Sequence, residues 1–202
     1  MTGEMNRRAA MIGAAGALAF VLIAWLTMSG AASGFDAAVR DMVHSWSSPL
    51  LTSLMVGISA TGTDVFMGAL GFLSVWRLLH LERRRDAIVF VVTVLAAEAL
   101  MEILKLSFHR ARPLPFFAER PDSFSFPSGH ALKSAVFYIL LASLASRHWA
   151  VRLAAALLSL LIGISRVYLG VHYPTDVLGG YAIAIVCLAA ASYRRMPVCP
   201  SE

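Results

Sequence analysis

The chain has 202 residues, of which 58% are hydrophobic and only 14% are charged, whereas about 25% of residues are charged in a typical globular protein. No water-facing fold can bury so much apolar surface, so the composition excludes an ordinary soluble domain and indicates an integral membrane protein. The net charge of +5 lies in short basic clusters between apolar segments, which favours membrane orientation over a nucleic-acid partner.

The first apolar segment covers residues 9–30 and follows the basic pair Arg7-Arg8. No charged residue occurs between Ala9 and Phe35. This run is longer than the hydrophobic region of a signal peptide, which is typically about 7–15 residues, so we expect a retained first helix. Cleavage at the small residues 30–33 is the alternative.

Residues 35–46 separate the first two apolar segments and show a helical pattern. Phe35, Val39, Met42, Val43 and Trp46 recur at helical spacing with charged residues between them. The pattern predicts an amphipathic helix in the outer membrane interface, with a plain polar loop as the alternative.

Five further apolar segments follow, and we expect each to form a membrane-spanning helix. The start of the second is unclear because Gly57, Gly62 and Asp64 interrupt it, and the fourth is short and can borrow a turn from the residues just before it. The sequence therefore predicts an all-α bundle of six transmembrane helices in a single domain, residues 1–202. The five segments are 51–79, 86–106, 131–146, 150–168 and 175–193.

The basic residues predict the orientation of this bundle. If the N-terminus is cytoplasmic, ten of the 17 Lys and Arg residues lie on the inner side. The positive-inside rule then places both termini in the cytoplasm and the loop 107–129 on the periplasmic or extracellular side of a cell (inner) membrane. The ten are Arg7, Arg8, Arg77, Arg83, Arg84, Arg85, Arg147, Arg152, Arg194 and Arg195.

The segment from Ser165 to Asp176 (SRVYLGVHYPTD) contains a candidate nucleophile. Pro174 suits the first turn of the last helix, with His172 just before that turn and Asp176 just inside it. A carboxylate there can accept the Nδ1 proton of His172 and leave Nε2 as a nucleophile. Helix capping beside a structural histidine is the alternative.

The sequence Pro127-Ser128-Gly129-His130 is typical of a helix start. Ser128 can cap the helix, and Gly129 allows close backbone approach. The N–H groups of the first turn, together with the helix dipole, can hold a phosphate, and His130 is placed to protonate a leaving alkoxide. The motif is only moderately specific by itself.

The segment KLSFHRARP, residues 105–113, supplies cations at the end of the third span. Lys105 and Arg112, together with Arg166, can neutralise the oxygens of a transferring phosphoryl group. The alternative for Lys105 is snorkelling at a helix end. We expect three neighbours to be solvated loop residues: His109, Arg110 and Arg120.

Other charged residues lie close to these blocks in sequence. Glu98 and Glu102 share one helix face with Lys105, so Glu102 and Lys105 can form a structural ion pair, or Glu102 can tune the lysine. Lys133 follows His130 by one turn and can add positive potential to the same site.

Taken together, the blocks match the patterns K-x6-RP, PSGH and SR-x5-H-x3-D, and the chain therefore resembles the type 2 phosphatidic acid phosphatase (PAP2) superfamily. The motifs cover residues 105–176. The resemblance implies a phosphatase that needs no metal or other cofactor and acts through a phosphohistidine. His172 would attack phosphorus, Asp176 would orient it, and His130 would act as the acid and then activate water. The implied phosphate-binding residues are Lys105, Arg112, Ser128, Gly129 and Arg166.

The resemblance is greatest to bacterial lipid phosphatases, so the expected partners are a lipid phosphate and the bilayer. Undecaprenyl diphosphate is the first expected substrate, followed by phosphatidate or phosphatidylglycerophosphate, with lipid A as a further candidate. A phosphotransferase acting on another lipid such as lipid A, and a non-catalytic lipid-binding scaffold, are the alternatives. The oligomeric state is left open.

Overall fold

The computed structural model describes residues 2–119 and 121–194, and within these ranges the secondary structure is entirely helical. Two residues considered above, Arg120 and Arg195, lie outside the described residues. The helices are α1 (Thr2–Met28), α2 (Ser33–Ser45), α3 (Pro49–Thr61), α4 (Asp64–His80), α5 (Arg84–Phe108), α6 (Gly129–Ala145), α7 (Trp149–Tyr168) and α8 (Pro174–Arg194).

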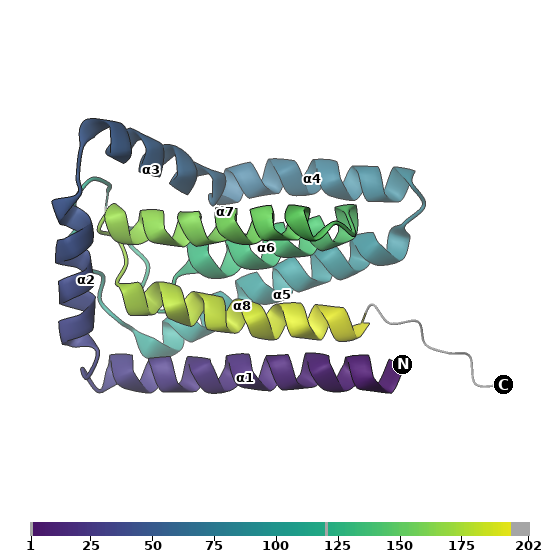
Figure 1. Ribbon diagram of the computed structural model, residues 1–202, viewed down its shortest axis with the longest axis horizontal. Coiled ribbons are helices and arrows are strands. Elements are labelled where there is room, and N and C mark those ends of the chain that lie inside the picture. Colours follow the sequence, from purple (N-terminus) through teal and green to yellow (C-terminus); the bar gives the residue numbers. More distant parts are fainter. Residues whose placement is uncertain (1, 120, 195–202) are drawn as a thin grey trace.

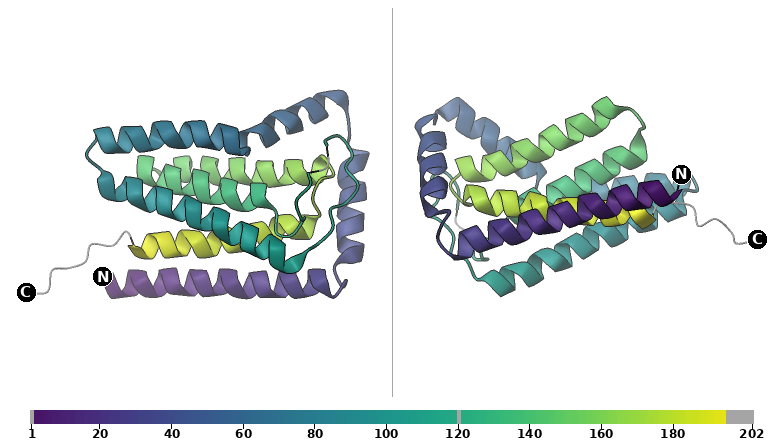
Figure 2. Two further views of the ribbon diagram at one scale, coloured as in Figure 1. Left: turned by 180° about the vertical axis from the view of Figure 1, so that it is seen from behind. Right: turned by 60° about the horizontal axis from the view of Figure 1, so that its bottom comes forward.

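The long helices run side by side in alternating directions, and α2 lies across one end of the bundle (Figure 1). Helix α1 begins, and α8 ends, at the opposite end. Seen from behind, the connection between α5 and α6 folds back at the α2 end (Figure 2). The ends of α5 and α7 and the starts of α6 and α8 are therefore gathered on the α2 side of the bundle.

Several helices meet the requirements for crossing a bilayer. Helices α1, α5, α7 and α8 are long and apolar enough to do so, and α3 and α4 together form a fifth candidate span. This span bends by 47° between the two helices, which explains why the sequence pattern was interrupted near residue 62. The chain is thus a multi-pass membrane protein, in which α6 is apolar but shorter.

The predicted amphipathic helix is confirmed as α2, and the alternative of a polar loop is wrong. Phe35, Met42 and Trp46 are exposed apolar residues along it, whereas Val43 packs into the molecule. An unexpected feature is Asp36, which is only 1% exposed.

Helix α6 is the buried centre of the bundle. It has 17 residues, and apolar side chains are buried on all its sides, against α5, α7 and α8. A helix that is hydrophobic all round belongs inside a structure rather than on its surface. It starts at Gly129, two residues before the predicted span, and ends at Ala145, so it gains less than the full turn that the sequence suggested.

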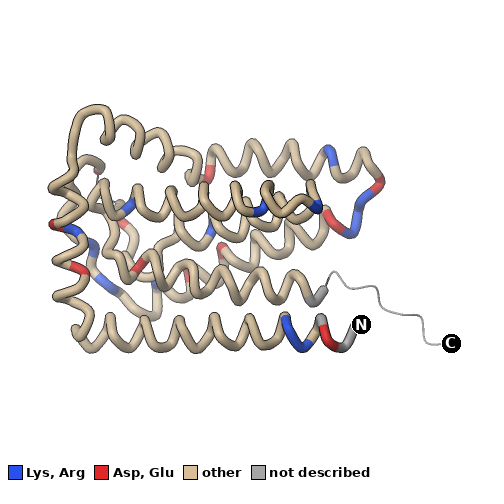
Figure 3. The backbone as a smooth tube through the Cα atoms, in the orientation of Figure 1, with Lys and Arg blue, Asp and Glu red and all other residues tan. Residues whose placement is uncertain are grey.

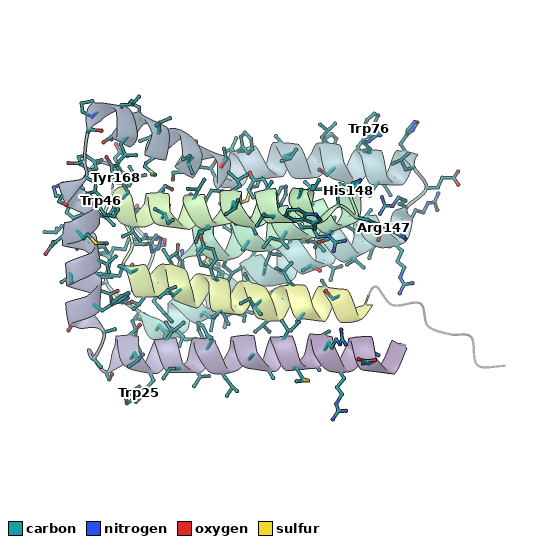
Figure 4. The ribbon with its side chains drawn as sticks, viewed as in Figure 1. Trp25, Trp46, Trp76, Arg147, His148 and Tyr168 are labelled. Carbon is teal, nitrogen blue, oxygen red and sulfur yellow. The ribbon has the colours of Figure 1, made fainter. Side chains whose placement is uncertain are left out.

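The surface fits a bilayer. Charged residues gather at the two ends of the bundle and around a group in its interior, and long stretches of the helices between them carry none (Figure 3). Trp25 and Trp46 lie toward the α2 end, and Trp76 lies toward the other end (Figure 4). Tryptophans are enriched at both membrane interfaces, so this distribution supports a membrane-spanning arrangement.

Two glycines allow α8 to lie directly on the segment that precedes α6. A Cβ on Gly179 would come within 2.7 Å of the Phe126 ring, and one on Gly180 within 2.7 Å of the Ser128 carbonyl oxygen. The backbone contact is closed by a hydrogen bond from Ser128 N–H to the carbonyl of Asp176 at 2.9 Å. The starts of α6 and α8 are thereby held together.

We expect Gly180→Ala to destabilise the protein by about 1–3 kcal/mol, because backbone atoms of the α6 start must move to admit the methyl group. Thermal unfolding in detergent would measure this. Gly68→Ala is the matched control, since a Cβ there meets nothing within 4 Å. Equal unfolding temperatures for the two variants would contradict the tight contact.

Candidate active site

The three motif segments come together around a cavity of about 210 Å³. It lies between α5, the start of α6, the end of α7 and the segment before α8. Ser128 and Asp176 are fully buried next to it. The predicted site residues in the cavity wall are Lys105, Arg112, Gly129, His130, Arg166 and His172, together with Glu102 and Lys133.

His172 is buried, and both nitrogens of its ring have partners. Nδ1 lies 3.4 Å from Asp176 Oδ2 and 3.4 Å from Ser125 Oγ. Nε2 lies 3.0 Å from Arg112 Nη1. A guanidinium can only donate, so Nε2 of the neutral ring accepts and the proton resides on Nδ1. This is the tautomer in which Nε2 carries the lone pair of a nucleophile.

Burial lowers the pKa of His172 to about 4, although the neighbouring Asp176 carboxylate acts in the opposite direction. Residues 169–173 connect α7 to α8, so the ring lies outside the spanning helices. At neutral pH the imidazole is therefore uncharged.

Asp176 is 0% exposed, and several donors surround its carboxylate. Oδ2 accepts from Ser125 Oγ at 2.5 Å and from the Tyr173 N–H at 2.8 Å. Oδ1 accepts from Arg110 Nη1 at 2.5 Å. The expectation that Arg110 is a solvated loop residue is therefore wrong, because its side chain is 16% exposed and paired with a buried carboxylate.

Arg112 and Lys105 converge on one loop residue, Ser123. The Arg112 guanidinium donates from Nε to the Ser123 carbonyl at 2.6 Å, from Nη2 to Ser123 Oγ at 2.9 Å, and from Nη1 to the Val171 carbonyl at 2.9 Å. Lys105 Nζ donates to Ser123 Oγ at 3.3 Å. Ser123 was not singled out in the sequence, where no local pattern distinguishes it from other loop serines.

Arg166 reaches the cavity from the last turn of α7. Its Nη1 donates to Ser59 Oγ on α3 at 2.6 Å, and Ser59 is itself buried. Ser59 orients this guanidinium from a helix that is far away in sequence. The role of Ser59 was therefore not predictable from the sequence.

Six buried side-chain polar atoms of the described residues have no hydrogen-bond partner, and three of them lie at the site: Ser128 Oγ, His130 Nε2 and Arg166 Nε. Such atoms are unfavourable in a protein interior unless a ligand or water satisfies them. Ser128 occupies the N-cap position of α6, but its hydroxyl makes no capping bond, so the side-chain cap expected from the sequence is wrong. These three atoms belong to residues of the cavity wall or its immediate border.

Gly129 brings the start of α6 close to the cations. A Cβ there would lie 3.3 Å from Met101 Sδ and 3.7 Å from Lys105 Nζ. The N–H groups of a first helical turn lack intrahelical partners, and the dipole adds positive potential at the same place. The wall facing Lys105 therefore suits an anion.

The acidic side of the cavity differs from expectation. The suggested Glu102–Lys105 ion pair is not formed, since Lys105 bonds to Ser123 and Glu102 is exposed on the wall. Lys133 instead pairs with Asp64 and with Glu98, whose Oε2 lies 3.2 Å away. The positive charge of Lys133 is thus balanced locally.

Within residues 2–119 and 121–194, no group of three or more His, Cys, Asp or Glu side chains is arranged to hold a metal ion. The charged groups nearest His172 are instead guanidinium groups and a carboxylate.

These features define a membrane protein with a cation-lined cavity that contains two histidines in its wall. The sequence model of the PAP2 superfamily matches residues 86–197, and the chain belongs to this superfamily.

Its relatives act on lipid phosphates. The chain is 30% identical over 179 residues to phosphatidylglycerophosphatase B of Bacillus subtilis (strain 168), covering 84% of this chain and 87% of that protein. It is 28% identical over 157 residues to undecaprenyl-diphosphatase of Sulfolobus acidocaldarius, covering 74% and 73%. A crystal structure of a transmembrane PAP2 type phosphatidylglycerolphosphate phosphatase from Bacillus subtilis matches with a TM-score of 0.83 and 28% identity, over 89% of this chain and 93% of that one.

The lowered pKa of His172 predicts that its ring stays neutral as the pH falls to about 5, with protonation centred at about 4. The folded pKa lies below the unfolded value, so protonating this ring opposes folding, and its contribution to stability is lost as the pH falls from about 6.5 toward 4. Nitrogen-15 NMR of histidine-labelled protein, with His172→Gln to assign the signal, would measure this. A midpoint above 6 would contradict the prediction.

Proposed function

We propose that the chain is a membrane lipid phosphatase that hydrolyses a terminal phosphate through a phosphohistidine on His172, without a metal ion. The observation that supports this most strongly is the state of His172. Its Nδ1 side faces the buried carboxylate of Asp176, and its Nε2 side faces a cavity lined by Lys105, Arg112 and Arg166.

In the first step, His172 Nε2 attacks phosphorus while the bond from phosphorus to the leaving alcohol oxygen breaks. Arg112 donates a hydrogen bond to Nε2 before the reaction. As the Nε2 lone pair forms the bond to phosphorus, this N–H group donates to a phosphate oxygen instead. Arg166 and Lys105 stabilise the charge on the other oxygens. His130, which also lines the cavity, gives a proton to the leaving oxygen.

In the second step, His130 takes a proton from water, and the water oxygen attacks the phosphohistidine. The phosphorus–nitrogen bond breaks, inorganic phosphate forms, and His172 returns to its neutral state. Asp176 stabilises the positive charge on the ring while the phosphohistidine exists. Ser128 and the N–H groups at the start of α6 hold the phosphoryl oxygens in both steps.

For the substrate we propose a lipid with a terminal phosphate, and we place phosphatidylglycerophosphate before undecaprenyl diphosphate, phosphatidate and lipid A. This changes the order expected from the sequence. The change rests on the similarity to phosphatidylglycerophosphatase B, which extends over 84% of the chain.

For the topology we propose six spans, namely the five candidate spans described above and α6. Both termini then lie in the cytoplasm, and the cavity opens to the periplasmic or extracellular side of the cell membrane. Helix α6 is about 25 Å long and is enclosed by neighbouring helices, so its length need not match the full bilayer. The basic turn at residues 83–85 lies at the end of the bundle where α1 begins, consistent with a cytoplasmic location.

We expect the purified protein to release phosphate from phosphatidylglycerophosphate in the presence of EDTA, and His172→Ala to lower kcat by about 10⁴-fold or more. A panel with undecaprenyl diphosphate, phosphatidate and lipid A would rank the substrates. The matched control is His148→Ala, an exposed histidine at the other end of the bundle (Figure 4), which should keep wild-type activity. Activity lost with EDTA and restored by a metal ion would contradict metal independence.

Single cysteines test the topology in intact cells, after Cys187 and Cys199 are replaced by serine. Glu119→Cys, in the loop between α5 and α6, should react with a membrane-impermeant maleimide from outside. Arg147→Cys, in the turn between α6 and α7, should react only after the membrane is opened. Both positions are exposed, so the reverse labelling pattern would overturn the orientation.

A further inference from the structure

A chain of ionic hydrogen bonds connects α2 with the aspartate behind the nucleophile. Arg110 Nη2 donates to Asp36 Oδ2 at 2.7 Å, and Arg110 Nη1 donates to Asp176 Oδ1 at 2.5 Å. One guanidinium thus bridges two buried carboxylates that lie far apart in sequence. The guanidinium also packs over the ring of Tyr173, and the ring centroid lies 4.1 Å from Arg110 Cζ.

The same carboxylate on α2 holds the start of α8. Asp36 Oδ1 accepts from the Thr175 N–H at 3.0 Å, and Asp36 Oδ2 accepts from Thr175 Oγ1 at 2.7 Å. Thr175 Oγ1 also accepts a bond from Arg110 Nη1 at 2.8 Å. Asp36 therefore contacts α8 directly at Thr175, the residue before Asp176. It also contacts Asp176 indirectly, through Arg110.

The residues of this hydrogen-bond network are buried, so the network is part of the protein interior and not a set of surface ion pairs. Asp36 is 1% exposed, Thr175 5% and Asp176 0%. Removing one member of such a network leaves a charge without its partner in a low-dielectric environment. None of Asp36, Thr175 and Arg110 lines the 210 Å³ cavity, so they do not touch a phosphate there.

We propose that Asp36 and Arg110 are positioning residues for His172, through which α2 holds Asp176 in the place where it orients the nucleophilic ring. The inference rests on the proposed function, in which His172 attacks phosphorus. Asp176 Oδ2 faces His172, and Oδ1 faces Arg110, so the guanidinium determines how the carboxylate is turned.

The fork geometry of arginine matters for this role. Two separate N–H groups reach Asp36 and Asp176 at the same time, which the single ammonium of lysine cannot reproduce in the same plane. A small rotation of Asp176 would lengthen a contact with Nδ1 that already measures 3.4 Å. Displacements of about 1 Å in a catalytic group can cost about 100-fold in rate.

The experiment compares Asp36→Asn, Arg110→Gln and Arg110→Lys in the full-length protein, with phosphatidylglycerophosphate as substrate. We expect kcat to fall by about 10-fold for Asp36→Asn and by about 100-fold for Arg110→Gln, while KM changes by less than about twofold. Arg110→Lys keeps the charge but not the fork, so its kcat should fall between those of wild type and Arg110→Gln. The double variant, Asp36→Asn with Arg110→Gln, should have a kcat no lower than that of Arg110→Gln alone, because both residues act through one carboxylate.

Matched controls are Asp41→Asn, an exposed carboxylate on the same helix, and Arg147→Gln, an exposed arginine far from the site. Both should keep wild-type kcat. Thermal unfolding of every variant gives the folded fraction, to which kcat is normalised. If Asp36→Asn keeps wild-type kcat after this correction, or if the losses of the double variant multiply, the positioning role is overturned.

A second readout does not depend on turnover. Nitrogen-15 NMR of His172 should show the Nδ1–H tautomer in wild type and in Arg110→Gln, because Arg112 still donates to Nε2, but the Nδ1–H signal should shift in Arg110→Gln as its hydrogen bond to Asp176 weakens. Wild type that is inactive on every lipid of the panel would refute the proposed function, whereas the NMR signal would still decide whether Arg110 orients the ring. An Nδ1–H signal in Arg110→Gln that is identical to that of wild type would overturn the inference.

Discussion

The site depends on keeping one ionised carboxylate inside the protein. Burying an unpaired charge is strongly unfavourable, so Asp176 can remain an anion only where donors surround it. Its partners come from both ends of the loop that connects α5 to α6 and from the residue just before its own helix. Each of these segments must be in place for the carboxylate to be tolerated, so a single charge ties the ends of α5, α6 and α8 together.

Sequence reasoning was most successful where function depends on neighbours along the chain. The order of His172, Pro174 and Asp176 places a ring just before a helix and a carboxylate in its first turn, and the structure has this arrangement. Helix positions were likewise predictable, because long apolar runs leave few alternatives in a bilayer. The family resemblance, carried by these local motifs, is also confirmed.

The residues that were missed act across large sequence separations. Asp36 and Arg110 are 74 positions apart, and Arg166 and Ser59 are 107 apart, so no periodicity or motif connects them. Lys133 was expected to add positive charge, but two carboxylates from other helices balance it. Which helix faces which neighbour is decided by packing, and a single sequence contains no direct record of it.

The short central helix α6 bears on how the site could distinguish its substrate from the phospholipids that form the bilayer. Helix α5 has 25 residues and α6 has 17, and α6 begins beside Lys105, on the last turns of α5. Ordinary phospholipids carry their phosphate as a diester, with substituents on both sides. The recess of about 210 Å³ is lined by both imidazoles and by the cations, so a phosphate that ends a chain can enter it with its one substituent pointing outward, whereas a diester has a second substituent to accommodate. Under the proposed function, this difference would let the enzyme act among a vast excess of phosphodiesters without degrading the bilayer that surrounds it.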